Sequence, residues 1–196
     1  MTPFARLSEV APLNRMGSRN RYVTLGFLTP DAEDPAINRL VAHVSTHPFC
    51  HVELELGDGR SFSIFDGGTV FLREKSFANP NYVLLSLAVT DAEHAAVSRF
   101  CTDAVARKIG FHNIGMFSAY IRPRCIAGTP STQLGSTFCS KIVTEALQHG
   151  CIKEVSGMNP SCVTPSALYT ALRGSERLSI GSVPARHKQL IQFGCI

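Results

Sequence analysis

One cysteine of the chain has the local setting that a thiol nucleophile needs. Cys139 follows Ser136 and Thr137, either of which can cap a helix, and Gly150 can close that helix. A cysteine in the first turn lies beside unpaired N–H groups and partial positive charge, which favour the reactive thiolate. The position also suits a small packed side chain. Among the seven cysteines only Cys139 has this setting, so it is the predicted nucleophile.

A thiolate nucleophile needs a base, and the pattern favours His51. The run His51-Val-Glu-Leu-Glu-Leu alternates in polarity, Gly57-Asp58-Gly59 is a turn signal, and residues 61–65 alternate again. Together they predict a β-hairpin in which His51 opens the first strand, at the rim of a sheet. Cys50, beside His51, is the alternative thiol to examine. The other histidines are interpreted as structural residues: His43, His47, His94, His112, His149 and His187.

Strands and helices expected along the chain indicate how these two residues are positioned. Alternating or apolar runs predict strands at residues 22–28, 51–56, 61–65, 69–72 and 82–89. Cap signals predict helices after Asp34-Pro35, at the Thr90–Glu93 capping box, around Cys139 and at Thr164-Pro165, with a shorter helical stretch around residues 112–120. This order predicts an α+β domain with a central antiparallel sheet that includes residues 51–56, 61–65 and 82–89, and with the Cys139 helix packed against it.

The chain divides into three parts. Residues 1–20 lack a clear period and are expected to form an N-terminal arm, residues 21–175 a single catalytic domain, and residues 176–196 a C-terminal tail. A loop of residues 122–135, rich in Pro, Gly, Ser and Thr, is long enough to be functional. The chemistry is therefore expected within the middle part.

Composition and charge exclude several classes of function. The net charge of +4 is modest and the basic residues are scattered, so nucleic-acid binding is not expected. The cysteines are odd in number without a C-x-x-C pair, which argues against a disulfide framework or a structural zinc site. Pro48 breaks any helix that could align His47, Cys50 and His51 on a metal ion. Since no signal peptide or membrane-spanning stretch is evident, we expect a reduced, cytoplasmic protein without a cofactor.

Two motifs carry a resemblance to a known family. The run His51-Val-Glu-Leu-Glu-Leu-Gly-Asp-Gly, followed far downstream by Phe138-Cys139-Ser140 at the start of a helix, resembles the permuted branch of the NlpC-like superfamily. This branch includes the YiiX-like proteins, viral and phage members and, more distantly, lecithin:retinol acyltransferase. The resemblance covers about residues 20–173 and implies a permuted papain-like fold, in which the histidine block precedes the cysteine. Family members often have an acidic residue after Phe-Cys-Ser, whereas this chain has Lys141, which could favour a thiolate or lie on the surface.

The resemblance also bears on the third catalytic residue. Many members have a polar residue on the strand after the histidine strand, and that spacing leads to Ser63. If the turn is a three-residue loop with Gly59 left-handed, Glu53 faces Ser63 on the side of His51; with a two-residue loop, Asp66 lies opposite His51. Glu53 shares the side of His51 in either register, and its charge can stabilise an imidazolium. Glu53 is therefore the predicted third residue, with Ser63 and Asp66 as alternatives.

These residues predict a cysteine-dependent hydrolase, a peptidase or amidase of the thiol protease kind. Cys139 would attack a carbonyl, His51 would take or share its proton, and the acyl-enzyme would pass to water or another acceptor. The resemblance implies a peptide, isopeptide or lipid-ester substrate. A lipid acyltransferase or esterase of the same fold, and a non-catalytic structural or virion-associated module, are the alternatives.

Overall fold

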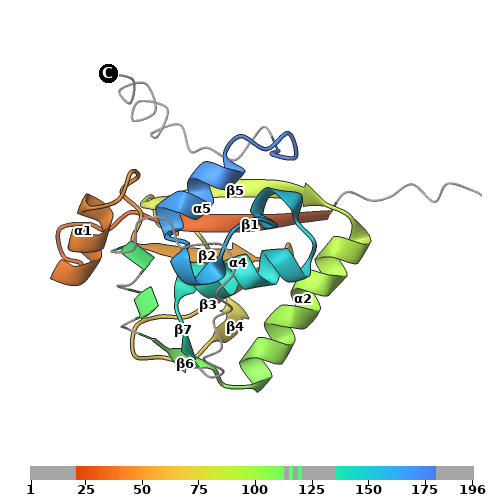
Figure 1. Cartoon of the computed structure of the whole chain (residues 1–196), viewed down its shortest axis with the longest axis horizontal. Coiled ribbons are helices and arrows are strands. Elements are labelled where there is room, and N and C mark those ends of the chain that lie inside the picture. The colour runs from red at the N-terminus through yellow and green to blue at the C-terminus, as the bar shows by residue number, and fades with distance from the viewer. Residues whose placement is uncertain (1–20, 113–114, 117–118, 121–135, 180–196) are drawn as a thin grey trace, which may run out of the picture.

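The structure, a computed structural model, describes residues 21–112, 115–116, 119–120 and 136–179 (Figure 1). Its centre is an antiparallel sheet of five strands in the order β4-β3-β2-β1-β5. These strands are β1 (Arg21–Leu28), β2 (His51–Glu55), β3 (Arg60–Ser63), β4 (Phe71–Glu74) and β5 (Tyr82–Val89). The expected α+β class is confirmed. The expected N-terminal arm, the loop at residues 122–135 and most of the C-terminal tail lie outside the described residues.

One face of the sheet forms the core and is covered by helices. Val23, Leu25 and Phe27 of β1 are fully buried, because alternate side chains of a strand point to the same face. On this face α4 (Cys139–His149) contacts β2 and β3, and it also contacts α2 (Asp91–Ala106) and α5 (Pro165–Leu172). Figure 1 shows α4 and α5 in front of the sheet, with α2 beside α4. The predicted packing of the Cys139 helix on the sheet is therefore confirmed.

Part of the other face of the sheet is covered by residues 75–81, which link β4 to β5 and which we call the strap. The Phe77 ring lies directly on Gly26 of β1, where an added Cβ atom would be 2.5 Å from Cε1 of that ring. Phe77 also packs edge-on against Tyr82, with ring centroids 4.9 Å apart. A side chain at position 26 would therefore push the strap away from the sheet.

The hairpin that carries His51 has the three-residue loop. Glu55 pairs with Ser61, and the N–H of Leu56 donates to the carbonyl of Arg60 at 3.2 Å. Gly59 has a φ of +81°, in the left-handed region that the loop requires. The two-residue register, which would have set Asp66 opposite His51, is thereby excluded.

Local cap signals are confirmed at two helices and wrong at two others. Thr90 caps α2 in a capping box, and Thr164 caps α5 before a proline. The N-cap of α4, however, is Phe138, without a side-chain cap. The residues expected to cap it form β7 (Ser136–Thr137) instead, which pairs in parallel with β6 (Gly110–Phe111). The first helix, α1 (Ala36–His43), has Pro35 rather than Asp34 at its N-cap, since the Asp34 carboxylate accepts the N–H of Asp31 at 2.8 Å.

The described chain ends alongside the sheet rather than in a separate tail. Two short 3-10 helices, η1 (Lys153–Val155) and η2 (Pro160–Cys162), lead from α4 to α5. After α5, Leu178 forms a bridge with Leu87, so that residues 177–179 lie along the free edge of β5. Residues 177–179 thus pack against the sheet. No helix of the described residues is long and apolar enough to cross a membrane.

The cysteines differ in one respect from the expected fully reduced chain. Cys162 is disulfide-bonded. Free thiols are present at Cys50, Cys101, Cys139 and Cys151. The nucleophile predicted from the sequence is therefore available as a thiol.

Candidate active site

Cys139 is the first residue of α4 and is 5% exposed. Because Phe138 provides no side-chain cap, the N–H groups of the first turn remain directed at the start of the helix. The backbone N–H groups of Ser140, in the same turn, and of Val52, in β2, help to lower the pKa of the thiol. Backbone groups from two elements thus act on one thiol.

The sulfur lies near the point where the pairing between β2 and β3 ends. The ladder between these strands ends at the pair Leu54 and Phe62. Beyond it, the carbonyl of Val52 accepts a hydrogen bond from the Ser63 hydroxyl at 2.7 Å. The N–H and C=O of one strand residue point to the same side, so the Val52 N–H also faces the gap and meets Cys139. Ser63 therefore supports the backbone of the site.

His51 is the first residue of β2, and it interacts directly with Cys139. The imidazole is buried and stacks on the ring of Phe65, with centroids 4.6 Å apart and planes 18° apart. Burial lowers the pKa of His51, but the neighbouring Cys139 and Glu53 outweigh it and raise the pKa to about 9. Conversely, burial raises the pKa of Cys139, while the His51 charge and the two N–H donors outweigh it and lower the pKa below its ordinary value. The opposite shifts favour a thiolate–imidazolium pair.

Glu53 is completely buried on the His51 side of the sheet. Its carboxylate accepts hydrogen bonds from Ser61 Oγ at 2.5 Å and from the Tyr82 hydroxyl at 2.7 Å, and it forms an ion pair with Lys75. Burial raises the pKa of Glu53, but His51 and these donors lower it to about 2. The side chain is therefore an anion at neutral pH.

The Glu53 carboxylate also lies close to the imidazole. His51 Nε2 lies 3.6 Å from Glu53 Oε1. That distance suits an ion pair but is too long for a hydrogen bond, and Nε2 has no hydrogen-bond partner among the described residues. The structure thus brings together Cys139, His51 and Glu53, the three residues predicted from the sequence.

The alternative residues have other surroundings. Cys50 donates its thiol proton to the carbonyl of Leu28 at 3.5 Å. Burial, Asp34 and Cys139 raise the pKa of Cys50 to about 12, so it remains a thiol. Asp66 is exposed, beyond the end of β3. Lys141 is buried rather than on the surface, and its ammonium lies 3.9 Å from Glu145, which balances its charge.

Sequence reasoning missed the residues that surround this site: Phe65, Lys75, Tyr82 and Tyr120. Lys75 also donates to the Tyr82 hydroxyl at 2.6 Å, which ties the strap to β5. Tyr120 lies near the thiol: burial, and then Cys139, raise the pKa of its hydroxyl. Only the strand order could have identified Tyr82, because it pairs with Leu28, which in turn pairs with His51.

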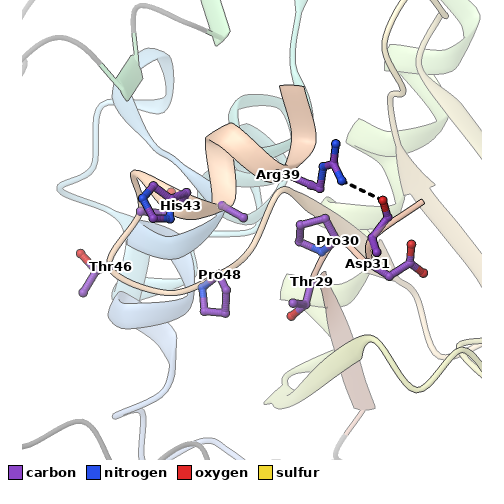
Figure 2. Close-up of a pocket in the computed structure, with 10 residues that line it drawn as sticks. Thr29, Pro30, Asp31, Arg39, His43, Thr46 and Pro48 are labelled. Carbon is purple, nitrogen blue, oxygen red and sulfur yellow. Dashed lines mark hydrogen bonds between the residues drawn. The ribbon is translucent and has the colours of Figure 1, made fainter. Parts of the chain in front are cut away.

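A separate pocket of about 620 Å³ lies past the end of β1, between residues 29–32 and α1 (Figure 2). In Figure 2, Arg39 reaches across it, and its guanidinium donates to the carbonyl of Ala32 at 2.8 Å. The rim also includes Asp31, His43 and Thr46. Since Cys139, His51 and Glu53 do not line this pocket, it is not the site of thiol chemistry.

The described residues contain no group of three or more His, Cys, Asp or Glu side chains that could hold a metal ion. No family model, curated protein or solved structure matches this chain.

Proposed function

We propose that this protein is a cysteine-dependent hydrolase that cleaves an amide bond, of a peptide or isopeptide, through an acyl-enzyme. The proposal rests on the placement of Cys139 at the start of α4 beside His51, a contact that lowers the pKa of Cys139 and raises the pKa of His51. Burial alone would have raised the pKa of Cys139 and lowered the pKa of His51. Buried Glu53 adds the charge that stabilises the imidazolium.

The reaction follows from these groups. The Cys139 thiolate attacks the carbonyl carbon, and the oxyanion that forms is stabilised at the N-terminus of α4, where the first-turn N–H groups lack a side-chain cap. His51, protonated up to about pH 9, donates its proton to the leaving amine as the C–N bond breaks. Water, deprotonated by the now neutral imidazole, then attacks the thioester and releases the acid and the thiolate.

The fold proposed for this chemistry is a permuted papain-like one. The histidine strand precedes the nucleophile helix in the chain, and that helix packs on the sheet beside the histidine strand. A second candidate function is acyl transfer on the same fold. The 5% exposure of Cys139 favours it, because a shielded thioester meets a bound acceptor more readily than bulk water.

The test is alkylation with iodoacetamide at mildly acid pH, mapped by mass spectrometry. We expect selective modification of Cys139, while Cys50 remains unmodified. His51→Ala should slow the modification at least about tenfold, since the thiolate loses its partner cation. His43→Ala, at an exposed position on α1, is the matched control and should react like the wild type.

The opposite outcome is equally clear. A Cys139 that reacts only at alkaline pH, or that reacts equally fast in His51→Ala, would show that the thiol has a packing role and would support a non-catalytic module. Once a substrate is known, Cys139→Ala should abolish its cleavage while the fold is kept. Full activity of that variant would overturn the nucleophile assignment.

A further inference from the structure

An aromatic and cationic patch adjoins the catalytic histidine. It consists of Phe65, Phe71 and Arg73, and we call it the Arg73 patch. The Phe65 ring stacks on two neighbours, the His51 imidazole and the Phe71 ring. The centroids are 4.6 Å apart in the first pair and 5.1 Å apart in the second, and the planes are 18° apart in both pairs. The Phe65 side of the stack reaches solvent, because this residue is 37% exposed. A continuous aromatic surface thus leads from the imidazole to the outside.

Arg73 holds an unneutralised charge over this surface. Its guanidinium carbon lies 4.3 Å from the ring centroid of Phe71 and 5.2 Å from that of Phe65. No carboxylate of the described residues lies within ion-pair distance of Arg73. The neighbouring cations differ in this respect, because Lys75 pairs with Glu53 and Arg60 pairs with Asp58.

We infer that Arg73 and Phe65 form a subsite for an anionic group of the substrate, a carboxylate or a phosphate, a few bonds away from the carbonyl that Cys139 attacks. The inference deepens the proposed function and rests on it. A guanidinium presents a planar fork of donors that matches both anions, and the two rings beneath hold that fork flat. Contacts run without a break from Cys139 through His51 and Phe65 to Arg73.

The experiment uses alkylation of Cys139, so it does not require a known substrate. The probes are iodoacetyl derivatives of glycine, β-alanine and γ-aminobutyrate, each as the free carboxylate and as the neutral methylamide, together with the corresponding aminoalkyl phosphonates. The measured quantity is the rate of Cys139 alkylation by the anionic probe divided by the rate with the neutral methylamide of the same chain length. The three chain lengths report how far the anion site lies from the sulfur.

In the wild type the ratio should be highest at one chain length. Arg73→Gln should lower it there by about five- to tenfold, and Arg73→Lys should restore part of it, since the charge returns without the fork. Arg60→Gln is the matched control, because its cation is already paired, and it should leave the ratio unchanged. A stronger dependence for the phosphonates identifies phosphate as the bound group, and a stronger dependence for the carboxylates identifies a carboxylate.

A ratio that is the same in Arg73→Gln and wild type overturns the inference. So does an equal loss of both rates, because Arg73 would then hold Phe65 in place without binding an anion. Failure of the proposed function is separate, since it would appear as neutral-probe rates that do not depend on His51.

Discussion

At the scale of single residues, the site is a row of alternating charges in a buried setting. The Cys139 thiolate, the His51 imidazolium, the Glu53 carboxylate and the Lys75 ammonium follow one another, each in contact with the next. Two anions and two cations cancel, which is what burial of several charges requires. Without Lys75, the buried row would carry a net negative charge, and Glu53 would bind a proton more readily.

Glu53 makes the stability of the protein depend on acid pH. Its pKa falls from an ordinary 4.5 to about 2 on folding, so its contribution is fully present above pH 4.5 and is lost as the pH falls through about 2. This pH-dependent contribution of Glu53 is on the order of 3 kcal/mol in the free energy of unfolding. We expect Glu53→Gln to remove it, so that variant and wild type converge near pH 2 in urea unfolding. Glu74→Gln, at an exposed position of β4, is the control. If Glu53→Gln still loses the same stability between pH 4.5 and pH 2, the pH dependence does not come from Glu53.

At the scale of elements, the strap decides how the Glu53 carboxylate is held. It delivers Lys75 and Phe77 to the face of the sheet that carries Glu53, and Tyr82 follows directly at the start of β5. Its close approach depends on Gly26, which pairs with Glu53 across β1 and β2. Because Gly26 has no side chain, the strap can approach the sheet, and Lys75 can neutralise Glu53 on the neighbouring strand.

Gly26→Ala should therefore act on the strap. The new methyl would meet the Phe77 ring at 2.5 Å, and we expect a loss of about 1–3 kcal/mol in the free energy of unfolding. Phe77→Ala alone should also destabilise, but the double variant should be more stable than the sum of the two losses predicts. Gly157→Ala, where an added Cβ meets nothing within 4 Å, is the control for the substitution itself. If urea unfolding shows that the losses of the two single variants add up in the double variant, the methyl of Gly26→Ala and the Phe77 ring do not clash and the strap moves aside without loss of stability.

At the scale of the whole molecule, Arg177 joins the segment after α5 to distant parts of the domain. Its guanidinium forms ion pairs with Glu93, in α2, and Glu154, in η1, and donates to the carbonyl of Ala88 at 2.9 Å. The side chain is 22% exposed. One residue therefore connects β5, a helix and a 3-10 turn.

Removal of this cation should cost more than removal of an exposed one. Arg177→Met removes the cation that faces two carboxylates and the donor to the Ala88 carbonyl, and we expect a loss of about 2–3 kcal/mol in the free energy of unfolding. Arg21→Met breaks the pair with Asp91, in which both side chains are more than half exposed, and it should cost less than about 1 kcal/mol. Equal losses for the two variants, measured by chemical denaturation, would contradict the joining role of Arg177.

The sequence predicted what depends on near neighbours in the chain. The hairpin followed from Gly57-Asp58-Gly59, although its register stayed open between a three-residue and a two-residue loop, and the α2 cap followed from Thr90 and Glu93. The cap of α4 was wrong because Ser136 and Thr137 pair with β6, a partner distant in the chain. Lys75 and Tyr82 were missed for the same reason, since only the strand order brings them to Glu53.

The order of the elements along the chain has a consequence for synthesis. All five strands of the sheet precede α4, so the ribosome releases His51, Glu53 and the strap before it releases Cys139. The sheet and its polar cluster can form while the nucleophile is still absent. Until α4 docks, the Cys139 sulfur lacks both the Val52 N–H and the imidazolium. If Cys139 is the nucleophile we propose, the nascent chain carries no activated thiol, and reactivity arises when α4 docks on the sheet.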